Sequence, residues 1–141
     1  MQHQPNRFFV LVEADKEITN SVFYFLREIK KSVFIEPTTD ILEKYIVNEK
    51  EIFIIKPLIS EAPTQNIKGV ETATIEKMLV DIFCDDVIFS AQQGAEMRTI
   101  FKEAFTKYTI NQSKMLRYAD RRRKKEKLTK FAKTISNLWQ Y

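Results

Sequence analysis

The first part of the chain alternates between short apolar runs and apolar residues at helical spacing. Residues 8–13, 32–36 and 51–56 are runs rich in Phe, Val and Ile, each bounded by polar residues or proline, and they predict buried strands. A helix between the first two strands is indicated over residues 17–30 by one apolar face, made of Ile18, Val22, Phe25, Leu26 and Ile29 and widened by Phe23 and Tyr24. We expect this face to pack on the sheet.

A shorter helix over residues 39–46 fits between the second and third strands. Pro37 ends the strand before it, and Thr38, Thr39 or Asp40 can serve as its N-cap. The resulting βαβαβ order is most simply a small parallel sheet with right-handed crossovers.

Residues 57–72 hold two prolines, a glycine and several small polar residues, which predicts a connecting loop. Beyond it the spacing of apolar residues is helical. Residues 75–83 predict a helix whose buried face contains Ile75, Met78, Leu79, Ile82 and Phe83, with Lys77 and Asp81 paired on the opposite, polar side. A brief helix over 86–91, capped by Asp85 or Asp86, precedes a longer one over 95–108 with the stripe Met97, Ile100, Phe101, Ala104, Phe105 and Tyr108.

The apolar face changes direction near the C-terminus. Met115 and Ala119 lie within about 40° of each other on a helix, whereas Leu128, Phe131 and Ile135 cluster roughly 160 to 220° away. One straight helix cannot bury both sets against one body. We therefore expect a bend over residues 121–125; the alternative is a long helix with two different partners.

These patterns together predict an α/β fold, a small three-stranded βαβαβ sheet followed by a helical C-terminal half. At 141 residues, the chain is expected to form a single domain over residues 1–141, with a sheet half at 8–56, a connecting loop at 57–72 and a helical half at 73–141.

The formal net charge of +4 is unevenly distributed. Residues 114–133 contain ten basic and two acidic side chains, a local balance of +8, which leaves −4 for the rest of the chain. A mildly acidic body with a basic C-terminal region indicates a polyanionic or acidic partner.

Several classes of site and location are excluded on composition. Two glycines are too few for a glycine-rich phosphate loop, and one Cys and one His cannot build a structural zinc site or an internal disulfide. We expect no cofactor and no bound metal. No apolar run reaches the length of a membrane span and the N-terminus lacks a signal segment, so we expect a cytoplasmic protein without membrane anchorage.

The basic cluster is the strongest candidate site. On a helix beginning near Asn111, five cations project within about 100° of one another, opposite Met115 and Ala119. Such a helix can pack its apolar side and hold its charges at a spacing suited to phosphates; the alternative is a solvated face or a contact with an acidic protein. Tyr108 and Tyr118 are expected in the core or at its boundary, although they could stack on bases. The candidate binding residues are Lys114, Arg117, Arg121, Arg122, Lys124 and Lys125.

Catalytic chemistry has little support. The segment Glu13-Ala14-Asp15-Lys16 resembles the strand end of metal-dependent nucleases, but Ala14 stands where a carboxylate is needed, and Asp15 suits a helix N-cap. Glu61, Asp85 and Asp86 lack the spacing of a calcium loop. Cys84 follows an apolar helix and has no activating histidine, because His3 lies near the terminus; we expect a core or boundary cysteine.

The residues 71–84 (ETATIEKMLVDIFC), 93–96 (QGAE) and 114–125 (KMLRYADRRRKK) resemble the C-terminal region of AbiEi-like proteins, which are antitoxins and transcriptional regulators of abortive-infection systems. In that family an N-terminal winged helix binds operator DNA, and the C-terminal domain neutralises a nucleotidyltransferase-like toxin encoded beside it. The matching motif-helix positions are Glu76, Lys77 and Asp81, followed by the basic helix.

The first strand begins at Phe8, which leaves no room for a winged helix before it. For a complete gene product the resemblance therefore implies a stand-alone antitoxin-type domain, and for an excised domain it implies that the DNA reader was left out. We expect a non-catalytic antitoxin or regulatory domain of a phage-defence toxin–antitoxin system that contacts nucleic acid or an acidic partner. The alternatives are a divergent nuclease-like enzyme on the βαβαβ core and a structural or oligomerisation domain.

Overall fold

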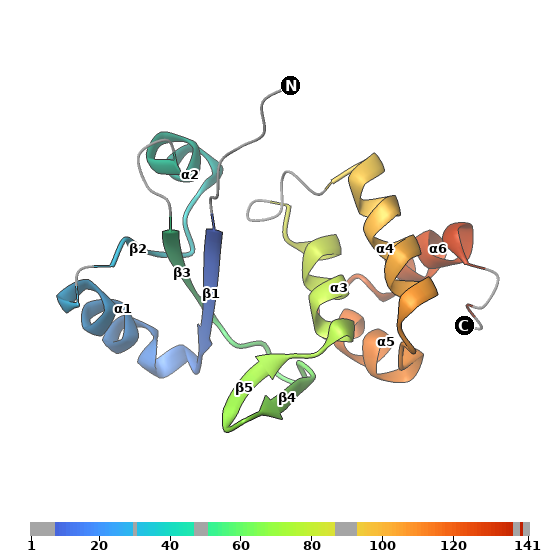
Figure 1. Cartoon of the computed structure of the whole chain (residues 1–141), viewed down its shortest axis with the longest axis horizontal. Coiled ribbons are helices and arrows are strands. Elements are labelled where there is room, and N and C mark those ends of the chain that lie inside the picture. Colours follow the sequence, from blue (N-terminus) through green and yellow to red (C-terminus); the bar gives the residue numbers. More distant parts are fainter. Residues whose placement is uncertain (1–7, 30, 47–50, 87–92, 137–138, 140–141) are drawn as a thin grey trace. The chain divides into compact units, whose positions relative to one another are not determined.

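The three apolar runs at the start of the chain form one parallel sheet, as predicted (Figure 1). Both edge strands pair with the third strand, so the chain order β1, β2, β3 becomes the sheet order β1-β3-β2. The register aligns Val10 with Phe53 and Phe34 with Ile54. Because the third strand is central, its residues Ile52, Ile54 and Ile55 are fully buried. The strands are β1 (Phe8–Ala14), β2 (Val33–Ile35) and β3 (Glu51–Pro57).

The computed structural model describes residues 8–29, 31–46, 51–86, 93–136 and 139. The chain divides into two compact units, residues 1–58 and 59–141, and the second unit begins inside the predicted connecting segment 57–72. A single domain over residues 1–141 was expected, whereas the contacts within the chain fall into these two units. The predicted brief helix over 86–91 and His3 lie outside the described residues, apart from Asp86.

The helix after β1 begins later than predicted and buries a narrower face. A short 3-10 turn, η1 (Lys16–Ile18), precedes α1 (Thr19–Glu28). Asp15 is the N-cap residue of η1: its backbone carbonyl accepts from the Ile18 amide at 2.9 Å, and its side chain makes no capping hydrogen bond. Val22 and Leu26 are half-buried, whereas Phe25 and Ile29 are exposed. The predicted broad buried face was therefore wrong, whereas Asp15 does occupy an N-cap position, without a side-chain capping bond. A sheet of three short strands covers only one narrow strip of a helix.

Helix α2 (Thr39–Ile46) fills the second connection as predicted. Among the three candidate caps, Thr38 is the one whose side chain acts, since its Oγ1 accepts from the Ile41 amide at 3.3 Å. The first unit thus has the predicted βαβαβ order.

The segment predicted as a loop contains a β-hairpin. Strands β4 (Thr64–Ile67) and β5 (Val70–Ala73) pair antiparallel through a two-residue turn at Lys68 and Gly69, both with positive φ. The Asn66 side chain accepts from the Gly69 amide at 2.9 Å and supports the turn. Lys-Gly is a weaker hairpin signal than Asn-Gly, and the strands are polar, so apolar periodicity did not reveal them.

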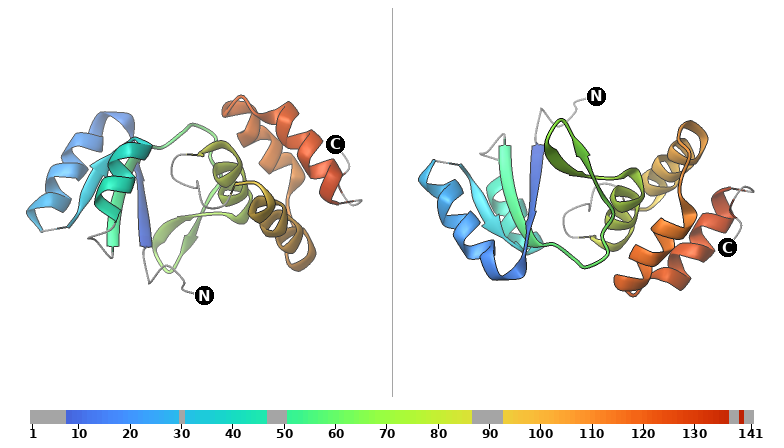
Figure 2. Two further views of the ribbon diagram at one scale, coloured as in Figure 1. Left: turned by 90° about the horizontal axis from the view of Figure 1, so that it is seen from above. Right: turned by 90° about the horizontal axis from the view of Figure 1, so that it is seen from below.

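In the described part of the second unit four helices follow the hairpin, and both views of Figure 2 show them gathered together. Their shared core includes Leu79 from the first of them, Phe101 from the second, Met115 from the third and Leu128 from the fourth. The two apolar faces that could not line up on one straight helix therefore meet one core, because the chain turns between them. The helices are α3 (Ile75–Cys84), α4 (Ala95–Lys107), α5 (Gln112–Arg121) and α6 (Lys125–Ile135).

Within the described residues, no helix is long and apolar enough to cross a membrane.

Candidate functional site

Helix α5 presents a basic side and an apolar side, as predicted. The Asn111 side chain caps the helix by accepting from the Lys114 amide at 3.0 Å. Met115 and Ala119 are fully buried, while Lys114 and Arg117 are exposed. The local amphipathic pattern thus places these charges outward.

A tight turn separates α5 from α6, which confirms the predicted bend. The Arg123 amide donates to the Asp120 carbonyl and the Lys124 amide to the Ala119 carbonyl, both at 2.9 Å. These two bonds form a Schellman motif, in which the residue after the helix cap adopts a left-handed conformation. Arg123 occupies that position with φ 60°, where glycine is usual.

The turn also changes the predicted single basic face. Lys124 is half-buried in the turn, and Lys125 begins α6, so neither lies on the helical face that Arg117 and Arg121 share. Nε of the Arg121 guanidinium donates a hydrogen bond to Oγ of Ser60 at 3.0 Å. The prediction that five cations share one helix face was therefore wrong beyond Arg121, because helical angles do not continue through a left-handed residue.

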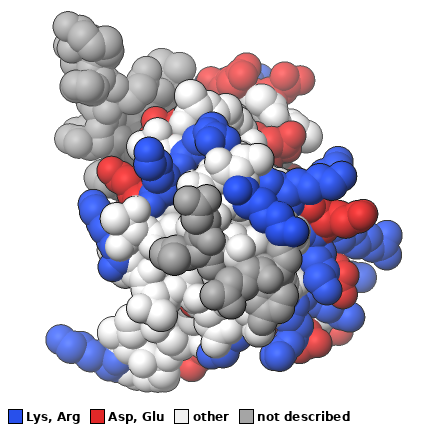
Figure 3. Space-filling view, turned by 90° about the vertical axis from the view of Figure 1, so that its right-hand side faces the viewer, with Lys and Arg blue, Asp and Glu red and all other residues white. Residues whose placement is uncertain are grey.

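A basic groove, with a volume of about 570 Å³, lies along the turn and one side of α6. Its cations are Arg123, Lys125, Lys130 and Lys133, and its acidic residues are Asp120 and Glu126, with Thr129 beside them. All four cations are exposed, and within the described part of the chain none of them forms a salt bridge. In Figure 3 blue Lys and Arg side chains gather toward one margin of the face shown, with some Asp and Glu among them.

Of the predicted binding residues, only Lys125 lines this groove. Arg123, Lys130 and Lys133 were not predicted as site residues. Residues 126, 130 and 133 are spaced so that they lie on one side of a helix, and this spacing could have indicated that side of α6. The groove could not be recognised without the turn that brings Arg123 beside α6.

Arg122, by contrast, points into the second unit. Its Nη1 lies 2.6 Å from Oδ1 of Asp81, and only 13% of each side chain is exposed. The Tyr118 hydroxyl donates to the same carboxylate oxygen at 2.6 Å, and Lys77 Nζ lies 2.6 Å from Oδ2. The prediction of Arg122 as an outward phosphate contact was wrong, because its charge is compensated inside the protein. We call Lys77, Asp81, Tyr118 and Arg122 the Asp81 network.

The same network corrects the predicted position of Lys77 and Asp81. The pair was expected on the polar side of its helix, but Lys77 is only 2% exposed. Its ammonium lies 5.7 Å from the centre of the Tyr118 ring, a cation–π contact. Both Glu76 and Lys77 are buried, whereas Met78, predicted to be buried, is 45% exposed. The buried face of α3 is thus rotated toward its charged residues.

Burial changes the acid–base behaviour of two groups near the network. Burial, together with the hydrogen bond to Asp81, raises the pKa of Tyr118 above its usual range. Burial also raises the pKa of the Cys84 thiol, partly offset by the positive charge of Arg122. Tyr118 is fully buried, as expected for a core tyrosine. Tyr108 is 58% exposed, so the prediction that it lies in the core or at its boundary was wrong.

Glu76 connects two helices of the second unit. Its Oε2 accepts from the Asn111 backbone amide at 2.8 Å, and the residue is 7% exposed. Asn111 is also the N-cap of α5, so Glu76 on α3 positions the start of the basic helix. All three motif-helix residues taken from the family resemblance, Glu76, Lys77 and Asp81, therefore contact α5 or the residue that caps it.

The acidic residues considered as metal ligands form no metal site among the described residues. In the described ranges, no three His, Cys, Asp or Glu side chains come together as a group that could hold a metal ion. Asp15 and Glu61 are exposed, and Cys84 is a half-buried free thiol.

One protein family matches residues 1–138, nearly the full length, and is described as a family of unknown function (DUF6577). No curated protein and no solved structure matches the chain.

Proposed function

The chain belongs to the DUF6577 family, whose function is unknown, and we propose that its second unit binds nucleic acid through the basic groove. It acts there as a non-catalytic antitoxin or regulatory module in phage defence, the role that the resemblance to AbiEi-like proteins implies. A nucleotidyltransferase-like toxin would then be a second partner.

The observation that carries this proposal is the position of Arg123. A left-handed conformation is costly for a residue with a side chain, and glycine would form the same Schellman turn without that cost. An arginine there extends its charge into the groove beside Lys125, Lys130 and Lys133. Backbone strain of this kind is often found where a side chain has a functional role.

The separation of internal from external charge supports the same conclusion. Arg122 and Lys77 share the carboxylate of Asp81, so their charges are satisfied by the fold. The groove cations contact solvent and give α6 a net positive surface, which attracts phosphates and releases their counterions on binding. Such contacts position a nucleic-acid backbone without reading its sequence.

The experiment measures binding of a fluorescein-labelled DNA duplex by fluorescence anisotropy over a range of salt concentrations. The triple variant Arg123→Ala, Lys130→Ala, Lys133→Ala is expected to bind more weakly. Its plot of log affinity against log salt should flatten by about one unit per lost phosphate contact.

The matched control removes the same charge from the same unit at exposed positions outside the groove, with Lys68→Ala, Lys102→Ala and Lys107→Ala. This control should retain most of the affinity and the wild-type salt slope. Equal losses in the two triple variants would contradict a specific groove and indicate only a general charge effect. No binding by the wild-type chain at low salt would contradict the proposal altogether.

A further inference from the structure

Strand β2 leaves one side of its backbone open. It lies at the edge of the sheet, since β3 is the one strand among the described residues that pairs with it. The Ser32 carbonyl accepts from the Phe53 amide at 2.8 Å, and the Glu36 amide donates to the Ile55 carbonyl at 3.1 Å. Alternate residues of a parallel strand bond to opposite sides. The amides and carbonyls of Val33 and Ile35 therefore point away from β3, where another strand could pair with them.

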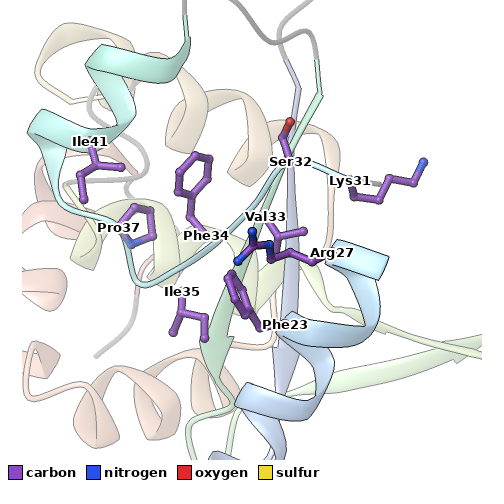
Figure 4. Close-up of a pocket in the computed structure, with 9 residues that line it drawn as sticks. All are labelled: Phe23, Arg27, Lys31, Ser32, Val33, Phe34, Ile35, Pro37 and Ile41. Carbon is purple, nitrogen blue, oxygen red and sulfur yellow. The ribbon is translucent and has the colours of Figure 1, made fainter. Parts of the chain in front are cut away.

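An apolar hollow with a volume of about 550 Å³ lies along this open edge. Figure 4 shows that its walls come from both sides of β2: Phe23 projects from α1, while Ile41 projects from α2. Phe34 and Ile35 of the strand itself also line the hollow. Because side chains of an added strand point alternately to its two faces, apolar residues on both faces would find apolar contacts here.

Two cations border the hollow. Arg27 lies with its guanidinium carbon 5.6 Å from the centre of the Phe23 ring, and it forms no salt bridge within the described residues. Lys31 lies 5.5 Å from the Phe53 ring centre, and its Nζ is 3.9 Å from a carboxylate oxygen of Glu51. None of the nine residues that line the hollow is acidic. The local charge therefore favours a ligand with carboxylates.

We propose that the edge of β2 binds an extended peptide segment of a partner protein, apolar at its centre and acidic at the end that lies beside Arg27 and Lys31, which adds to the sheet as a fourth strand. Backbone hydrogen bonds to Val33 and Ile35 provide affinity, and the hollow selects the apolar side chains. Arg27 and Lys31, both near the start of β2, select the acidic end, and a probe with acidic residues at both ends offers one to them in either strand direction. This site belongs to the first unit and is independent of nucleic-acid binding by the second.

The probe is a fluorescein-labelled peptide of sequence Glu-Asp-Val-Ile-Val-Asp-Glu with blocked ends, added to the full chain. Anisotropy should report binding, and hydrogen exchange of the Val33 and Ile35 amides should slow. Ile35→Pro removes an amide that points away from β3, a position where an edge strand tolerates proline. This variant should weaken binding roughly tenfold.

A second variant avoids any effect on the strand. Arg27→Glu reverses an exposed charge at the hollow and should weaken binding severalfold, whereas Lys16→Glu makes the same change at an exposed position of the first unit outside the hollow and should not. A control peptide with Lys in place of each acidic residue should not bind.

Three results would overturn the proposal. The first is absence of peptide binding at roughly millimolar concentration. The second is binding that neither Ile35→Pro nor Arg27→Glu weakens, or equal binding of the basic peptide. The third is a dimer in sedimentation that Ile35→Pro dissociates, which would assign the edge to a second copy of the chain.

Discussion

Asp81 and Arg122 are 41 residues apart in the sequence, yet Oδ1 of Asp81 lies 2.6 Å from Nη1 of Arg122. This contact connects the C-terminal part of α3 to the turn after α5. It also removes one arginine from the basic run and uses it inside the protein. Consecutive residues of that run therefore have different roles: Arg122 stabilises the fold, and Arg123 supplies charge to the groove.

Removal of Asp81 should destabilise the second unit strongly. In Asp81→Ala the ammonium of Lys77 stays buried without its carboxylate, which should lower the free energy of unfolding by about 3–5 kcal/mol. Lys77→Met should cost less, because Asp81 keeps its bonds to Tyr118 and Arg122. Urea unfolding measures both, with the exposed Glu103→Ala as a control expected to change little. A loss in Lys77→Met equal to that in Asp81→Ala would contradict this account.

Stability should fall at alkaline pH through Tyr118. Its pKa is raised in the folded protein, so the folded state keeps the phenolic proton after the unfolded state begins to lose it near pH 10. The stabilisation is fully present below about pH 10 and is lost as the pH rises above it, at up to about 1.4 kcal/mol per pH unit. Urea unfolding of wild type and Tyr118→Phe at roughly pH 8, 10 and 11 measures it. The advantage of the wild type should shrink across that range; a constant difference would contradict the shift.

Glu76 should stabilise the start of α5. Glu76→Ala leaves the Asn111 amide without its acceptor, so the free energy of unfolding should fall by about 1–3 kcal/mol and exchange of that amide should accelerate. Glu76→Gln keeps an acceptor oxygen and should restore most of the loss. Hydrogen exchange followed by NMR distinguishes the two variants, and identical exchange at Asn111 in both would argue against the contact.

Arg123→Gly should separate stability from binding. Glycine adopts a positive φ without strain, so this variant should be more stable than wild type by up to about 1 kcal/mol while binding DNA more weakly. The matched control Arg117→Gly lies inside α5, where glycine should cost about 1 kcal/mol. Thermal unfolding and DNA anisotropy measure the two effects. A destabilised Arg123→Gly would mean that the arginine side chain itself supports the turn.

Local patterns predicted most elements well. The three apolar runs became strands, the helical stripe around Phe101 became α4, and the shift between Met115 and Leu128 correctly indicated a bend. These features depend on near neighbours along the chain, whose spacing the sequence displays directly. The hairpin was missed because its strands are polar and short, so their pairing depends on backbone bonds and turn geometry.

The candidate site was predicted only in part. Residues with outward charges on α5, such as Lys114 and Arg117, lie where the helical spacing placed them. Lys77 was assigned to the polar side of its helix by helical spacing, and Arg122 was assigned to solvent as part of the basic cluster. Their burial depends on one carboxylate that both can reach, and no local pattern shows that Lys77 and a residue after α5 share it.

The sequence by itself determined the βαβαβ order of the first unit, the parallel sheet, the bend and the concentration of positive charge near the C-terminus. Only the tertiary structure decided which cations are inside and which line a groove. The physical reason is that exposure of a charged side chain depends on whether packing supplies a counter-charge. For Arg122 that partner is Asp81, whereas Arg123, one residue later, faces outward because the left-handed turn redirects the backbone.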